Sequence, residues 1–182
     1  MSADLSPGCL LIAAPAMLDP NFEGTVVLLC AHEKEGSVGL VLNRPMQIPA
    51  AQALPPAEFL GSDKHELRWG GPVGVSQVFL LHESPVSPAE GRQIAGGVHF
   101  GGGLDAAQRI EQSGGHLRFF VGYTGWGENQ LEQEIEAGGW LLLFADAAEI
   151  WATDHLWQWE RLVGKAAPEL SWLRQAEHPD SN

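Results

Sequence analysis

Seven histidines are the side chains of this sequence best suited to metal binding or proton transfer. No two of them lie four positions apart, no His-Glu-x-x-His segment occurs, and the two cysteines, Cys9 and Cys30, are twenty-one positions apart. Because these spacings do not match a zinc site, we expect no metal and no cofactor. His32 and His82 each end an expected strand, and their imidazoles could converge on a polar patch with a ligand-binding or acid–base role.

Two glycine-containing segments resemble catalytic or phosphate-binding motifs without matching them. Ser37 lies in Gly36-Ser-Val-Gly39, which lacks the Gly-x-Ser-x-Gly pattern and sits in an expected hairpin instead of a strand-to-helix turn. Gly101-Gly-Gly103 precedes an expected helix, but it lacks the P-loop lysine and the acidic ribose partner of a dinucleotide site. We interpret the first segment as a turn with a polar hydroxyl and the second as a flexible turn.

A helix over residues 130–137 is expected to begin with a capping box. In this arrangement Asn129 accepts a backbone N–H as the N-cap, and Glu132 reaches back to the N–H of Asn129. Glu132 and Glu134 are two positions apart and nearly opposite on a helix, so they cannot pair as a general acid and base. Glu132 and Glu136 share a face, which is only a weak indication of a cation site.

Charge and composition limit the classes of partner and the cellular location. The chain has 23 acidic and 10 basic residues in 182, a formal net charge of −13, and its arginines are scattered singly. Such a charge repels phosphate backbones and argues against direct nucleic-acid binding. The apolar stretches are too short to cross a membrane, no signal peptide is recognised, and two cysteines in apolar runs favour free buried thiols. We therefore expect a cytoplasmic protein.

The pattern of apolar runs predicts a mixture of strands and helices in one domain. Expected strands cover residues 10–14, 25–32, 38–43, 78–82, 117–121 and 140–144. Expected helical segments are two short turns at 50–54 and 56–60, a helix from Leu104 that ends at Gly114, and a tail with Leu156, Trp159 and Val163 on one stripe. The elements neither alternate regularly nor segregate, which favours an α+β fold with a mixed sheet. We expect residues 1–182 to form a single domain, with residues 178–182 frayed.

A series of motifs in a fixed order resembles a known protein family. The motifs are Leu11-Ile-Ala-Ala-Pro-Ala-Met-Leu-Asp-Pro-Asn-Phe22, Gly36-Ser-Val-Gly-Leu-Val-Leu-Asn-Arg-Pro45, Gly70-Gly-Pro72, Phe79-Leu-Leu-His82 and Gly122-Tyr-Thr-Gly-Trp126 with Gln130. Together they resemble the YqgE/AlgH family of bacterial proteins, a group of uncharacterised function. The resemblance implies a compact α+β fold with a branched β-sheet, partly closed as a small barrel, and helices around it. The sequence departs from the family's Trp-Gly-Pro-Gly-Gln pattern at Glu128 and Asn129.

The best-matched motifs also supply the candidate site. Tyr123 and Trp126, like Trp69 and Trp140, lie beside glycines, where backbone comes close and loops often carry function. The hypothesis, supported mainly by membership of the family motifs, is a ligand- or partner-binding patch. Its members are His32, Asn43, Gly70, Gly71, Tyr123, Trp126 and Gln130.

Two functions are compatible with the sequence. The first is a non-catalytic protein that binds a protein partner or a small ligand, with any regulatory role indirect, because each motif has a sufficient structural explanation. The alternative is an enzyme that acts on a small molecule or peptide through the polar patch near His32 and His82. The sequence leaves the partner, the ligand and the oligomeric state open.

Overall fold

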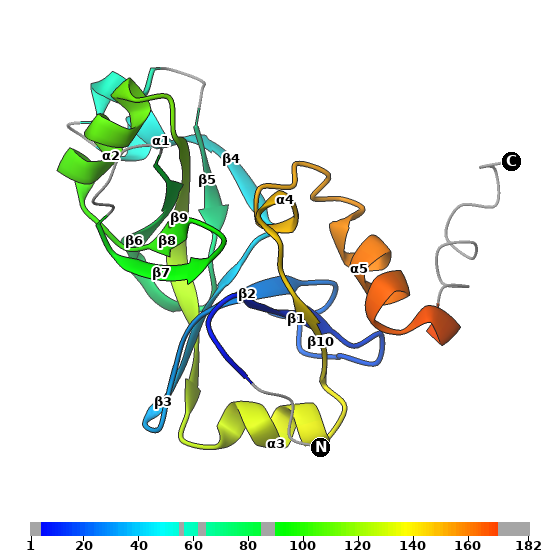
Figure 1. Cartoon of the computed structure of the whole chain (residues 1–182). Helices are drawn as coiled ribbons and strands as arrows, with labels where there is room; N and C mark the ends of the chain where they lie inside the picture. Colours follow the sequence, from blue (N-terminus) through cyan, green and yellow to red (C-terminus); the bar gives the residue numbers. More distant parts are fainter. Residues whose placement is uncertain (1–4, 55–56, 62–64, 85–89, 171–182) are drawn as a thin grey trace, which may run out of the picture.

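The computed structural model describes residues 5–54, 57–61, 65–84 and 90–170 (Figure 1). Within these residues ten strands form one connected sheet. The strands are β1 (Cys9–Ala13), β2 (Val26–Glu33), β3 (Gly36–Val41), β4 (Pro45–Pro49), β5 (Glu66–Trp69), β6 (Val73–Glu83), β7 (Arg92–Ala95), β8 (Val98–Phe100), β9 (His116–Gly127) and β10 (Trp140–Phe144). The α-helices are α1 (Ala50–Ala53), α2 (Leu104–Gln112), α3 (Gln130–Glu136), α4 (Ala147–Ile150) and α5 (Gln158–Ala166), with short 3₁₀ helices at Glu58–Leu60 and Pro168–Leu170.

The long strand β9 joins the two parts of the sheet. The strand order is β10-β1-β2-β3-β9-β6-β8-β7, and β5 leaves this path to pair with β9 and β4. Residues 119–121 of β9 pair with β5, residues 124–127 pair with β3, and β6 follows the other edge. The β5–β9 pair is parallel and the other pairs are antiparallel. The expectation of mixed strands and helices is confirmed, as a mixed α/β fold on a large, mainly antiparallel sheet.

The expected partial barrel is wrong, because the sheet does not close. A barrel needs each strand to be paired on both sides. Here β10 and β7 are the two ends of the strand order, and Figure 1 shows them apart, with β7 at the left and β10 beside β1 near the centre. Helix α5 packs against β10 and β1 at one end of the sheet. Strands β5 and β4 branch from β9 and do not pair with β10 or β7. The two end strands therefore each keep one unpaired edge, and the ring stays open.

The core is built from strands that are covered on both faces. In β2 the side chains of Val26, Leu28 and Cys30 enter one apolar cluster, with Leu162 and Val163 of α5. The alternate residues of β2 enter a second cluster, which includes the Trp126 and Trp140 rings and Leu131 of α3. A strand with two buried faces reads as a continuous apolar run, and the sequence prediction for this segment is confirmed.

The helices agree with the sequence in most places. Helix α2 buries Ala106, Ala107 and Ile110 and ends before Gly114, whose φ of 74° is left-handed. Helix α5 begins at Gln158, so the expected stripe is wrong at Leu156, which precedes the helix and is 73% exposed. The expected fraying of residues 178–182 lies outside the described residues. None of the helices in the described ranges is long and apolar enough to span a membrane.

Candidate functional site

The seven predicted site residues lie in three separate places. His32, Trp126 and Gln130 gather around helix α3, at one end of β2 and β9. Gly70, Gly71 and Tyr123 lie where the chain before β6 crosses β9. Asn43 lies at the opposite end of β2 from His32, because its side chain accepts the Val26 N–H at the start of that strand. The structure therefore does not bring the seven residues together as one patch.

Around α3, the motif residues Trp126 and Gln130 bind a carboxylate of the same chain. The Trp126 indole N–H donates to Oε2 of Glu134, and the Trp140 indole donates to the same oxygen, both at 2.9 Å. The Gln130 amide donates to Oε1 of Glu134, also at 2.9 Å. These bonds attach α3 to β9 and β10. They give Trp126 and Gln130 a structural role beside the predicted binding role.

The predicted capping box at the start of α3 is wrong. An N-cap residue needs extended backbone dihedrals, whereas Asn129 is left-handed with a φ of 57° and makes no side-chain cap bond. The Gln130 side chain instead accepts the N–H of Gly127 at 3.0 Å. A left-handed residue here explains why the family pattern has glycine at this position, since asparagine is among the residues that tolerate it best.

Glu132 is free of the cap and faces His32 instead. Its carboxylate lies 3.6 Å from Nε2 of His32, whose Nδ1 is 2.8 Å from the Ser37 hydroxyl. The three groups in line, a carboxylate, an imidazole and a hydroxyl, resemble a nucleophilic triad. However, Ser37 is only 5% exposed, and the accessible group is the carboxylate of Glu132. Nucleophilic attack on a substrate needs an accessible hydroxyl, so this arrangement does not suit it.

His82 does not converge with His32. It pairs with Leu117 at one end of β9, whereas Ser37, the neighbour of His32, pairs with Trp126 at the other end. Nine residues of strand separate these positions, about 30 Å. His82 is fully buried, stacks on His99 and contacts the carbonyl oxygen of Glu90 at 2.8 Å. Within the described residues, no group of three His, Cys, Asp or Glu side chains is placed to hold a metal ion.

The glycines of the second place allow two backbone segments to touch. An added Cβ at Gly71 would lie 2.2 Å from the carbonyl carbon of Tyr123, and one at Gly122 would lie 2.4 Å from the Gly71 oxygen. Gly70 connects the sheet across this crossing, since its oxygen accepts the Val41 N–H and its N–H donates to Val121. The close approach explains these glycines without a ligand.

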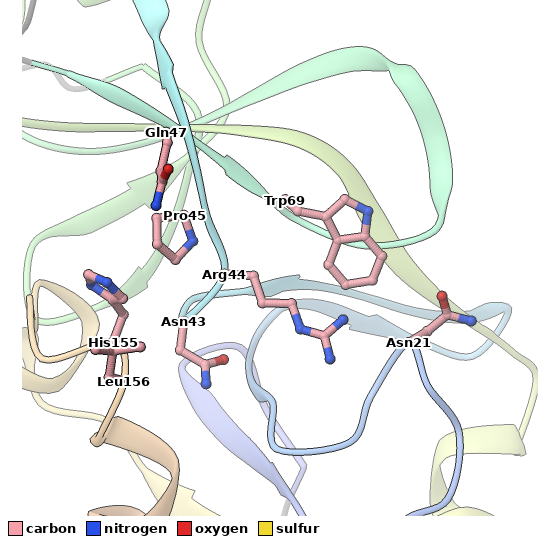
Figure 2. A pocket seen from close by; sticks show the side chains of 8 residues that line it. All are labelled: Asn21, Asn43, Arg44, Pro45, Gln47, Trp69, His155 and Leu156. Carbon is pink, nitrogen blue, oxygen red and sulfur yellow. The ribbon is translucent and has the colours of Figure 1, made fainter.

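Asn43, in the third place, belongs to an open pocket of about 670 Å³ (Figure 2). Its lining side chains come from four stretches of sequence: the β1–β2 loop, β4 with the residues before it, the end of β5, and the loop before α5. They are Asn21, Asn43, Arg44, Pro45, Gln47, Trp69, His155 and Leu156. Asn43 positions this wall, because its amide accepts the Val26 N–H and donates to the Gly24 oxygen, at 2.9 and 2.8 Å.

Arg44 and Trp69 contact each other within the pocket. The guanidinium carbon lies 5.1 Å from the centroid of the Trp69 ring, a cation–π contact. Nη2 of Arg44 also donates to the carbonyl oxygens of Glu23 and Pro20, at 3.0 and 3.4 Å. Burial lowers the pKa of Arg44 and the nearby charge of Glu23 raises it, and an arginine in this setting stays protonated.

The wall of the pocket formed by β4 carries backbone strain. Gln47 has a φ of 57°, and apart from Asn129 it is the non-glycine residue with a positive φ among the described residues. The pairing of β4 with β5 shifts register between Pro45 and Pro49, around the same residue. A left-handed conformation costs about 1–2 kcal/mol for a residue with a Cβ. Strain and strand irregularities of this kind are concentrated at functional sites.

Two buried arginines lie on strands next to the pocket. Arg68 pairs with Pro45 in the sheet and donates to the Leu42 oxygen at 2.7 Å. Arg118 donates to the carbonyl oxygens of Ile150, Trp151 and Ala152 at the end of α4. Burial, together with the charge of Arg68, lowers the pKa of Arg118 to about 9. Both guanidinium groups are hydrogen-bonded to backbone carbonyl oxygens, without a carboxylate within ion-pair distance among the described residues.

Sequence reasoning found part of this pocket. Asn43 was among the predicted site residues, and Trp69 was noted beside its glycines. Arg44 could have been found, because it follows Asn43 within a family motif. His155 and Leu156 have no sequence signal, since they reach the pocket only through the packing of α4 and α5 against the sheet.

The fold and the pocket define a mixed α/β protein with an open pocket beside a branched sheet. The chain belongs to the AlgH-like family, DUF179, whose profile matches residues 10–171, and the resemblance seen in the sequence is confirmed. A UPF0301 protein of Chlorobium limicola is 37% identical over 163 residues, covering 87% of this chain and 86% of its own. A UPF0301 protein of Ralstonia nicotianae is 39% identical over 143 residues, covering 75% of each chain.

Two solved structures share the fold. The solution structure of the AlgH protein from Pseudomonas aeruginosa superposes with a TM-score of 0.69 at 29% identity, covering 97% of this chain and 96% of that one. A crystal structure of a Corynebacterium diphtheriae protein superposes with a TM-score of 0.76 at 21% identity, over 91% and 89% of the two chains. At that identity the second likeness concerns the fold alone.

Proposed function

We propose that this chain is a non-catalytic binding protein that takes a small ligand in the pocket around Arg44 and Trp69. The observation that carries the proposal is the pocket itself: polar side chains from four distant stretches converge beside an aromatic ring in a hollow of about 670 Å³. Volumes of about 300–1,000 Å³ with a few convergent polar groups are typical of small-molecule sites. The strain at Gln47 supports the same location.

The composition of the pocket favours binding over catalysis. Among its eight described lining residues, His155 is the one candidate for proton transfer, and no carboxylate, hydroxyl or thiol accompanies it. General acid–base or nucleophilic chemistry needs such a partner within hydrogen-bond reach. The alternative enzyme site near His32 has its hydroxyl buried. A regulatory role would then be indirect, through the ligand, and the two buried thiols and the acidic charge support a cytoplasmic setting.

A pocket-blocking variant tests the proposal. A panel of small organic acids, phosphorylated metabolites, nucleotides and neutral amides is added to the ¹⁵N-labelled protein, and amide shifts are followed by NMR. Leu156→Trp should fill the pocket mouth, while Leu18→Trp places the same side chain at a position that is 90% exposed and outside the lining. Ligands that shift residues 43–47 should lose affinity about tenfold in L156W and keep it in L18W.

Ligands that shift signals elsewhere and bind L156W unchanged would contradict the proposal. Equal melting temperatures of the two variants serve as the control for folding. The position of Leu156 outside any helix makes an effect on stability small, because surface substitutions usually change it by less than about 0.5 kcal/mol.

A further inference from the structure

Arg44 differs from the other arginines in how its charge is balanced. The surface arginines of the described ranges are paired with carboxylates: Arg92 with Glu33, Arg109 with Glu90, and Arg161 with Glu149 and Asp154. The buried Arg68 and Arg118 donate to backbone carbonyls. Arg44 opens into a pocket, and no carboxylate of the described residues lies within ion-pair distance of it. Among the partly exposed arginines of the described residues, Arg44 is therefore the one that no carboxylate pairs, and the charge of Glu23 acts on it only from beyond ion-pair distance.

The donors of Arg44 are only partly used. A guanidinium carries five N–H groups, of which Nε holds one and each terminal nitrogen two. Both hydrogen bonds of Arg44 to the described residues start from Nη2. Nε and Nη1 thus keep three N–H groups without an acceptor among the described residues. Each of these N–H groups can donate a charge-assisted hydrogen bond to an oxygen of a carboxylate or a phosphate.

The position of the guanidinium is fixed before any ligand arrives. The Trp69 ring covers one face, and the two carbonyl bonds hold Nη2. A guanidinium that is already oriented loses less conformational entropy on binding than a mobile arginine would.

The remaining lining residues provide further contacts without negative charge. Figure 2 shows His155, Leu156, Pro45 and Gln47 on the other side of Asn43 from the Trp69 ring. Nδ1 of His155 lies 3.0 Å from the Thr153 oxygen, so Nε2 is the nitrogen left to contact a ligand. The amide of Gln47 adds a polar contact, and Trp69 and Leu156 offer apolar surface.

We propose that the pocket recognises a small organic anion, whose carboxylate or phosphate accepts hydrogen bonds from the Nη1 or Nε N–H groups of Arg44. The uncharged part of the ligand lies on the apolar surface of Trp69 or Leu156. The inference rests on the proposed function, since it names the chemical class of ligand for the same pocket. Long polyanions such as nucleic acid are disfavoured by the overall charge of −13.

Matched probes separate the charge from the shape of the ligand. Benzoate is compared with benzamide, and phenyl phosphate with phenol, by NMR titration of the ¹⁵N-labelled protein. We expect saturable shifts at residues 43–47 with at least one anion, and binding of its neutral counterpart about tenfold weaker or absent. The comparison of benzoate with phenyl phosphate shows which oxyanion the pocket prefers. Binding should weaken as the salt concentration rises.

Arginine variants complete the test. Arg44→Gln removes the charge and should weaken binding of the anion about tenfold, while Arg44→Lys keeps the charge without the planar guanidinium, and its affinity should fall between those of Gln and wild type. Arg92→Gln is the matched control, because Arg92 is paired with Glu33 and lies outside the lining. Melting temperatures show whether R44Q remains folded. If R44Q unfolds, the affinity of R44K for the anion, compared with that of wild type, decides the test.

Two results would overturn the anion inference. One is equal binding of benzamide and benzoate, or of the anions to R44Q and wild type. The other is the absence of any saturable shift at the pocket with both anions. In either case the proposed function still stands if neutral members of the ligand panel bind in an L156W-sensitive way, and it fails as well only if they do not.

Discussion

Trp126 and Trp140 donate their indole N–H groups to one and the same oxygen, Oε2 of Glu134, each at 2.9 Å. The two rings also meet edge to face, with centroids 6.0 Å apart. One carboxylate therefore joins the end of β9, the start of β10 and the helix between them. Trp126 and Gln130 both donate to Glu134, so attachment of helix α3 to the sheet is a sufficient reason for their presence in a family motif.

Removing this carboxylate should destabilise the protein. In Glu134→Gln the two indoles lose a charged acceptor, and we expect a loss of about 2 kcal/mol in the free energy of unfolding. Urea unfolding followed by tryptophan fluorescence measures it. Glu136→Gln is the control, because Glu136 is exposed on the same helix. Equal unfolding of both variants would show that the shared acceptor contributes nothing.

The residues before β6 cross β9 in close contact. Alanine substitution should therefore destabilise the protein more at a glycine in this crossing than at one outside it. Gly122 and Gly24 have similar left-handed φ angles, 70° and 65°, so alanine is strained equally at both. A Cβ at Gly24 meets no atom within 4 Å, whereas at Gly122 it lies 2.4 Å from the Gly71 oxygen. We expect Gly24→Ala to cost about 1 kcal/mol and Gly122→Ala about 3 kcal/mol or more, measured by urea unfolding. Similar costs would mean that the crossing is looser than described.

The ion-pair cluster between α4 and α5 predicts a dependence of stability on pH. Burial raises the pKa of Glu149, but hydrogen bonds from Arg161 and Lys165 outweigh it, so the pKa falls below its ordinary value of 4.5. The hydrogen bond from Arg161 likewise lowers the pKa of Asp154 below 3.8. Carboxyl groups with lowered pKa values stabilise the fold above those ordinary values, and the contribution is lost as the pH falls through the lower folded values.

Arg161→Gln should therefore lower the free energy of unfolding by about 2 kcal/mol near neutral pH and by much less at about pH 3. Urea unfolding at several pH values gives the comparison. Arg92→Gln removes a pair that is about half exposed on both sides, and it should cost less than about 1 kcal/mol at any pH. A cost of R161Q that stays constant with pH would rule out the linkage.

The two cysteines should be unreactive while the protein is folded. Both are buried free thiols, as the sequence predicted, and burial raises the pKa of Cys9 to about 11 and that of Cys30 further. Because the thiolate is the reactive form, we expect no reaction with Ellman's reagent near pH 8 in buffer. Two thiols per chain should react after addition of guanidinium chloride. Rapid reaction of a thiol before unfolding would contradict the burial of these side chains.

The sequence predicted correctly those elements whose formation depends on neighbouring residues. The continuous apolar run of β2 and the glycine after α2 each reflect a single physical requirement that neighbouring residues show. The closure of the sheet was wrong, because closure depends on which strands reach its two edges. The cap at Asn129 was wrong, because a capping pattern does not reveal a left-handed backbone.

The candidate site was harder to predict for a related reason. Conserved-looking motif residues such as Gly71 and Trp126 meet the needs of a chain crossing and of a helix attachment. The pocket instead depends on Arg44 and on His155, which are more than a hundred positions apart and show no common pattern. The predicted binding role of the seven motif residues stays a prediction, and Asn43 is the member that lines the proposed pocket.

The place of β9 in the sheet has a consequence for synthesis on the ribosome. β3, β5 and β6 are all made before residues 116–127, the strand to which each of them pairs. Until that strand emerges, the nascent chain carries unpaired strand edges with strong tendencies to associate. We therefore expect co-translational folding to begin only after β9 has left the exit tunnel, and chains released before that point to aggregate or to be held by chaperones.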